Sequence, residues 1–204
     1  MPKVTWNGGT LLAPVPPVLV SCGTMEAANV LTIAWTGIIN TIPPKTYISV
    51  RPERWSYPMI RASGQFVINL PTAGLVRAVD FCGVRSGRTL DKFAACGLTK
   101  AAASKVECPI IAECPLSLEC RVTDEIPLGS HHMFLADIVA IEVDENLLDH
   151  AGKLHLDRAG LLAYAHGEYF ALGEKLGSFG YSVRKKPAAK SRPRSGKKAS
   201  GGKK

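Results

Sequence analysis

Apolar and polar residues alternate over many short runs along this chain, a pattern that indicates β-strands more than long helices. The clearest case lies in residues 29–56, where an apolar, β-branched run at 30–39 is followed by Pro43-Pro44 and an alternating run at 46–50. We expect two strands joined by a turn, because strict alternation gives a strand one apolar face and one different face. Amide, hydroxyl, indole and guanidinium groups gather in this stretch. It is either an ordinary hairpin with scattered polar residues or one side of a site for a flat, anionic ligand.

Further apolar runs predict strands at 18–20, 65–70, 117–124 and 133–143. The last of these is apolar on nearly both faces, so we expect it to be a central strand. Many short strands with few helices predict an antiparallel β-barrel with short helices at its ends. No Gly-x-Gly-x-x-Gly motif follows a strand, which argues against a classical dinucleotide-binding domain.

Two short helices are predicted from capping signals. Ser56 precedes Tyr57-Pro58 and is expected to cap a helix that ends at Gly64. Thr72 is expected to cap a second helix at 73–81, whose apolar residues fall on one face.

A loop at 83–93 combines two glycines with Ser86, Arg88 and Lys92. Exposed backbone amides and these side chains are suited to binding an anion. A solvated loop with incidental charges would have the same composition.

The formal charge of +8 is concentrated at the C-terminus of the 204-residue chain. Ten basic residues and no acid lie in residues 184–204, so residues 1–183 carry −2 (+8 less ten). We expect one domain at 1–185 and a disordered basic tail at 186–204. The basic balance is therefore no argument for a nucleic-acid-binding domain, and contact with nucleic acid is expected only through the tail.

The six cysteines occur without a Cys-x-x-Cys pair, and the N-terminus lacks the basic and apolar regions of a signal peptide. No apolar run reaches the roughly 18 residues of a membrane span. We expect free thiols, a cytoplasmic protein and no membrane partner.

Several motifs, in this order and spacing, resemble the flavin reductase-like family with the FMN-binding split-barrel fold, and most closely its flavoredoxin branch. The resemblance covers residues 11 to about 185 and rests on the sequences NVLTIAWTG at 29–37, SVRPERWSYP at 49–58, FVINLP at 66–71, SG at 86–87, DKF at 91–93, GSHH at 129–132 and GEY at 167–169. It implies a mainly β fold, an FMN-binding split β-barrel with Greek-key-like antiparallel strands and a few short peripheral helices. It also implies a homodimer that binds FMN non-covalently.

The resemblance places the site residues one by one. Asn29 and Trp35 match positions that touch the flavin, Ser56 and Lys92 match phosphate contacts, and His131 matches the histidine beside the flavin and the incoming nicotinamide. We expect His131 to be the catalytic residue. The full set of expected cofactor-binding residues is Asn29, Trp35, Thr36, Ser49, Arg51, Ser56, Lys92, His131 and Tyr164.

A metal site at His131-His132 is the alternative for the histidines, with His150, His155 or His166 as further ligands. Neighbouring residues on a strand face opposite sides, so the pair cannot easily share one ion. We expect no metal, with one histidine at the flavin and the other on the opposite side.

Two functions follow from the resemblance. The first is an FMN-dependent oxidoreductase that takes electrons from NADH or NADPH and passes them to a protein, a small-molecule acceptor or, as free reduced flavin, a partner enzyme. The second is a flavoredoxin-type electron carrier without NAD(P)H activity of its own.

Overall fold

The structure is a computed structural model that describes residues 1–184. Residues Met1–Gly173 form one compact unit, and a second unit begins at Glu174. The strands are β1 (Val18–Cys22), β2 (Asn29–Ile33), β3 (Thr36–Thr41), β4 (Pro44–Val50), β5 (Gln65–Leu70), β6 (Lys100–Ala101), β7 (Ile110–Ile111), β8 (Leu116–Pro127), β9 (His132–Val143), β10 (Leu162–Ala165) and β11 (Glu168–Ala171). The α-helices are α1 (Ser56–Ser63), α2 (Val76–Val84) and α3 (Lys92–Cys96), and the 3-10 helices are η1 (Ala73–Leu75), η2 (Glu145–Leu147), η3 (Leu156–Arg158) and, in the second unit, η4 (Tyr181–Val183).

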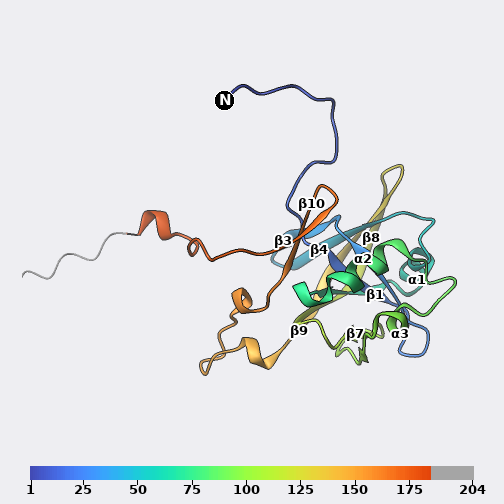
Figure 1. Ribbon diagram of the computed structural model, residues 1–204. Coiled ribbons are helices and arrows are strands. Elements are labelled where there is room, and N and C mark those ends of the chain that lie inside the picture. The colour runs from blue at the N-terminus through green and yellow to red at the C-terminus, as the bar shows by residue number, and fades with distance from the viewer. Residues whose placement is uncertain (185–204) are drawn as a thin grey trace, which may run out of the picture. The chain divides into compact units, whose positions relative to one another are not determined.

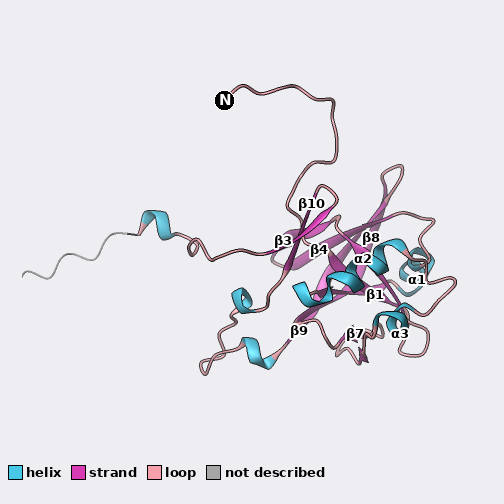
Figure 2. Cartoon of the chain, in the orientation of Figure 1, coloured by secondary structure: helices cyan, strands magenta, loops and turns pink. Residues whose placement is uncertain are grey.

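Seven strands form one antiparallel sheet in the order β2-β1-β5-β8-β9-β4-β3. Its two edge strands, β2 and β3, are joined only by Ala34 and Trp35. Three Cα–Cα steps of about 3.8 Å span at most roughly 11 Å. Six spacings of about 4.8 Å would separate the edges of a flat sheet by roughly 29 Å. The sheet must therefore curl until its edges approach each other, and Trp35 lies in the link that joins these edges. Figures 1 and 2 show the strands of the sheet together with the short helices α1, α2 and α3.

Both faces of the sheet are packed around β1. Inside the curl, Val18, Val20 and Cys22 alternate with Leu19, which faces the other way. The inner cluster is completed by side chains such as Phe66 and Phe134, whereas Leu19 packs against residues of α2 and α3. All five residues of β1 are buried for this reason.

Most of the predicted strands are confirmed. The run at 65–70 is β5, and 133–143 falls in β9, which lies between β8 and β4 and is central as expected. The predicted Pro43-Pro44 turn joins β3 to β4.

Three local predictions are wrong. The run at 30–39 is not one strand, because it breaks at Ala34 and Trp35 where the chain crosses between sheet edges. Ser56 does not cap α1: Trp55 is the cap residue, and the Ser56 side chain turns into the protein. Thr72 makes no side-chain cap bond, and the helix it precedes starts as η1 before α2 begins.

Cysteines Cys22, Cys82, Cys96, Cys108, Cys114 and Cys120 are all free thiols. Within the described residues, no helix combines the length and hydrophobicity needed to cross a membrane. The tail at 186–204 lies outside the described residues, and the expected domain end at 185 stays a prediction.

Candidate functional site

A groove runs along the seam of the sheet, and its first part is a cationic pocket of about 200 Å³. We use this name for the cavity between the start of β2, the segment after β4, and the loop that follows α2. It is lined by Asn29, Leu31, Arg51, Glu53, Arg54, Trp55, Ser56, Arg85, Ser86, Gly87 and Lys92. Four cations and one carboxylate in so small a cavity favour an anionic ligand.

Lys92 forms the buried floor of this pocket. Asp91 caps α3 by accepting hydrogen bonds from the Phe93 and Ala94 amides, which places Lys92 at the first position of the helix. The Lys92 Nζ donates to the carbonyls of Val30 at 2.8 Å and Cys82 at 2.9 Å. An ammonium has three protons, so one is left for a ligand. Burial lowers the pKa of Lys92 from its ordinary value, and an anion bound beside it would oppose that shift.

Asn29, Ser56 and Gly87 meet at the wall of the cationic pocket. The Asn29 Nδ2 donates to the Ser56 Oγ at 2.7 Å, and both side chains are buried. A Cβ at position 87 would lie 2.1 Å from the Asn29 Oδ1, so only glycine lets the loop approach this closely. Burial raises the pKa of the Cys22 thiol to about 11, and a side-chain hydrogen bond with Ser56 opposes that shift.

The second part of the groove, the seam pocket, continues from the first and shares Leu31, Arg51 and Arg54 with it. Its further lining includes Trp35, Ser49 and His131. Trp35 is 36% exposed, so its indole offers an accessible flat surface.

His131 directly precedes β9 and lines the seam pocket. Its Nδ1 is 2.9 Å from the Ser130 Oγ. Burial, followed by the nearby Arg51 guanidinium, lowers the pKa of His131, which favours the neutral imidazole. A neutral ring can donate one hydrogen bond or accept one at a ligand's edge.

Tyr164 stands apart from these two pockets. It lines a neighbouring apolar cavity with Thr10, Leu12 and Val15, and that cavity meets the seam pocket through Trp35. Tyr164 is positioned by β10, whose backbone pairs with Val15.

The structure brings seven of the nine predicted residues to the groove: Asn29, Trp35, Ser49, Arg51, Ser56, Lys92 and His131. Thr36 is placed elsewhere, because its buried hydroxyl donates to the Tyr47 carbonyl at 2.6 Å. Tyr164 reaches only the neighbouring cavity. Their roles as cofactor ligands stay predictions.

Sequence reasoning did not single out Arg85, Gly87 or the N-terminal residues 10–13. Gly87 was recognisable as part of a motif, but its contact with Asn29 depends on the loop's position. Residues 10–13 line the apolar cavity only because β10 holds Val15.

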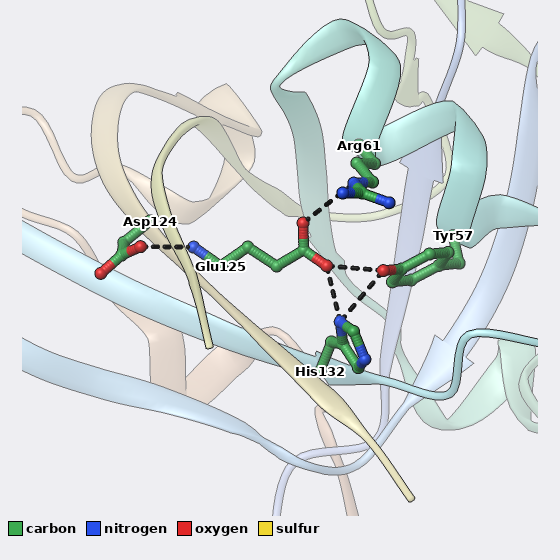
Figure 3. A network of polar contacts seen from close by, with 5 residues as sticks. All are labelled: Tyr57, Arg61, Asp124, Glu125 and His132. Carbon is green, nitrogen blue, oxygen red and sulfur yellow. Dashed lines mark hydrogen bonds and ion pairs between the residues drawn. The ribbon is translucent and has the colours of Figure 1, made fainter. Parts of the chain in front are cut away.

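A polar network lies behind the groove and joins α1 to the β8–β9 hairpin (Figure 3). The Glu125 Oε1 accepts from the Tyr57 hydroxyl and from the His132 Nδ1, both at 2.6 Å, and Arg61 pairs with Oε2 at 3.3 Å. The first two bonds hold the pKa of Glu125 below its ordinary value, and the carboxylate in turn raises the pKa of Tyr57.

Tyr57 and His132 directly follow the groove residues Ser56 and His131 but face away from them. The expectation that the two histidines face opposite sides is confirmed. Among the described residues, no three potential metal ligands come together.

Several known proteins are similar to this chain in sequence and in fold. The profile of the family described as "Flavin reductase like domain" matches residues 11–173, so the chain belongs to that family. Flavoredoxin of Desulfovibrio vulgaris (Miyazaki F) is 30% identical with a TM-score of 0.82, over 89% of this chain and 100% of its own. Flavoredoxin from Methanosarcina acetivorans is 26% identical with a TM-score of 0.80, over 90% and 100% of the two chains.

A third similar structure is the FMN-binding domain of a flavin reductases-like enzyme from Shewanella baltica OS155. It is 26% identical with a TM-score of 0.68, over 80% of this chain and 88% of its own. The family resemblance and the predicted fold class, mainly β with an antiparallel sheet and few short helices, are therefore confirmed.

Proposed function

We propose that this protein is an FMN-binding oxidoreductase that accepts electrons from NADH or NADPH and passes them to an acceptor. The observation that carries the proposal is the groove itself. It joins a pocket of four cations at one end to an exposed indole and a neutral histidine at the other. FMN has the matching polarity, with a phosphate of about −1.5 to −2 charge at one end and a flat ring at the other.

The residues present fit this cofactor. Lys92 has one donor available at the buried end, Ser56 adds a hydroxyl, and Arg51 adds a guanidinium where the two pockets meet. Gly87 leaves the space beside Asn29 open. When bound, FMN would supply the electron-accepting ring chemistry, and the protein would bind, orient and shield it.

His131 and Trp35 would act at the ring end. Trp35 would lie along the ring and limit the water that reaches it, and the His131 imidazole would hydrogen-bond at the edge where the nicotinamide enters. Because burial and Arg51 favour the neutral imidazole, it would orient the nicotinamide without adding positive charge beside a ring that becomes cationic when oxidised.

A flavoredoxin-type electron carrier is the second candidate, favoured by the similarity to two flavoredoxins. An absorption experiment separates the two. We expect purified protein to carry a flavin spectrum, and anaerobic NADH or NADPH to bleach it at a catalytic rate. If a reduced donor protein bleaches the flavin and neither nicotinamide does, the protein is an electron carrier and the proposed NAD(P)H activity is wrong.

We also propose that the protein is a cytoplasmic homodimer. Strand β3 is a sheet edge with Ile38 and Ile39 exposed, and Ile42 is exposed in the turn that follows it; such a patch supports association of two copies. Light scattering at micromolar concentration is expected to give twice the chain mass. A monomer that still holds FMN would contradict the dimer but not the cofactor.

A further inference from the structure

The cationic end of the groove carries more positive charge than one flavin phosphate requires. Four cations line the pocket, Arg51, Arg54, Arg85 and Lys92, and a fifth, Arg88, lies over the ring of the lining residue Trp55. Glu53, paired with Arg51 at 3.4 Å, is the one carboxylate among the residues lining the pocket, so the lining carries a charge of +3 (four less one). A phosphate of about −1.5 to −2 leaves about +1 to +1.5 of this charge unneutralised, and the neighbouring Arg88 adds to it.

The cations lie at two depths. Lys92 and Ser56 are buried at the floor, 4% and 1% exposed, where a flavin phosphate would bind. Arg85 and Arg88 are exposed at the rim. The rim therefore holds the charge that a single deep phosphate would leave unused.

An aromatic ring accompanies the rim cations. Trp55 lines the same pocket and is 40% exposed, and the Arg88 guanidinium lies 5.5 Å from the centroid of its ring. An exposed indole beside cations is the combination that binds a nucleobase by stacking and its phosphate by charge.

We propose that Trp55, Arg85 and Arg88 form a rim site for an adenosine phosphate, next to the flavin phosphate. This rests on the proposed function, because the adenosine phosphate would belong either to NADPH, through its 2′-phosphate, or to FAD in place of FMN. Both sources present a base that can stack on Trp55 and a phosphate within reach of the arginines.

The first test uses FMN-loaded protein and adenosine 2′,5′-bisphosphate, measured by calorimetry at two salt concentrations. We expect the probe to bind without releasing the flavin, about tenfold more tightly than inorganic phosphate and more weakly at high salt. The variants Arg88→Gln and Trp55→Leu should each weaken the probe about tenfold while leaving bound FMN in place. Arg77→Gln, which removes an exposed arginine of α2 outside the cationic pocket, is the matched control and should change nothing.

Two further arms separate the sources. If NADPH is the source, the holoprotein will have a KM for NADPH about tenfold below that for NADH, and Arg88→Gln will reduce that preference. If FAD is the source, flavin-stripped protein will bind FAD more tightly than FMN, and Arg88→Gln will abolish the difference.

The proposal is overturned if the probe binds no better than phosphate, if it displaces FMN, or if Arg88→Gln and Trp55→Leu behave like Arg77→Gln. The calorimetric titration measures binding alone and does not require a catalytically active protein. Protein that holds FMN but ignores the probe refutes the rim site alone, whereas protein that holds no FMN refutes the proposed function.

Discussion

At the scale of single residues, the groove depends on donors that are fixed before a ligand arrives. The Lys92 ammonium is held by two carbonyls and Ser56 by Asn29, so neither side chain must be ordered on binding. Ordering a long side chain costs free energy, so this arrangement favours affinity for a phosphate.

Lys92→Met should remove the deepest cation and keep most of the side-chain volume. We expect FMN affinity to fall about 10- to 100-fold, because a hydrogen bond to a charged group is lost. Riboflavin, which lacks the phosphate, should lose little affinity, and fluorescence titration with both flavins measures the ratio.

Trp35→Ala is the contrasting variant for that experiment, since it lies at the ring end and should weaken FMN and riboflavin alike. A Lys92→Met protein that loses both flavins equally would mean that Lys92 supports the fold and not the phosphate.

Gly87→Ala should also weaken FMN, because the new methyl group would meet the Asn29 Oδ1 at 2.1 Å and displace the loop or the amide. We expect a loss of at least about fivefold in FMN affinity, from a disturbance of about 1 kcal/mol or more. Gly83→Ala is the matched control, since its Cβ would meet Thr32 at 3.4 Å. Equal affinities for the two variants would exclude a close approach at position 87.

At the scale of elements, the Tyr57–Glu125–His132 network fixes α1 against the β8–β9 hairpin, and each element carries a groove residue. Ser56 precedes Tyr57, and His131 precedes His132, so the network sets how far apart the two ends of the groove lie. The loss of one bond in it should disturb both ends together.

Glu125→Gln should lower the free energy of unfolding near neutral pH, and the deficit should vanish in acid. A carboxyl whose folded-state pKa is depressed stabilises the fold above its unfolded pKa of about 4.3, and this contribution is lost as pH falls through the folded-state value. Urea unfolding from pH 7 down to pH 3 measures the difference between variant and native protein.

Glu145→Gln, which changes an exposed carboxylate in η2, is the control and should show no such dependence. A Glu125→Gln deficit that stays constant down to pH 3 would contradict an ionised Glu125 as the centre of the network.

The elements also show what sequence can reveal. Strands β5 and β9 were predictable because their apolar runs are bounded by turn residues and carry one conformation throughout. The break at Ala34 and Trp35 was not predictable, because both flanking segments are apolar and β-branched. Only the curl of the whole sheet requires the chain to pass here from one sheet edge to the other. Ser56 was misread for the opposite reason. Its local sequence fits a helix cap, but a tertiary bond from Asn29, 27 positions away, takes its side chain.

At the scale of the molecule, the groove exists because the sheet curls until its two edges are joined through Ala34 and Trp35. Its lining comes from β2 and the link that follows it, the end of β4 and the segment after it, the loop after α2, and His131 just before β9, which are far apart in sequence. The motifs that carry the family resemblance identified seven groove residues. They could not identify Arg85, whose place at the pocket follows from the path of the loop alone.

The position of the domain end gives a last prediction. The compact unit and the family match both end at residue 173, and residues 1–173 carry a formal charge of −2, since the Glu174 and Lys175 charges cancel. A chain that stops at Gly173 should keep its flavin and its unfolding midpoint but lose retention on a cation-exchange column. A chain that stops at Ala159 is the comparison. It lacks β10 and β11, and with them the backbone pairing of Val15 with Tyr164, so it should unfold at lower urea concentration. Loss of flavin from the 173-residue chain would mean that the flavin-binding domain extends past residue 173, to residue 185 or beyond.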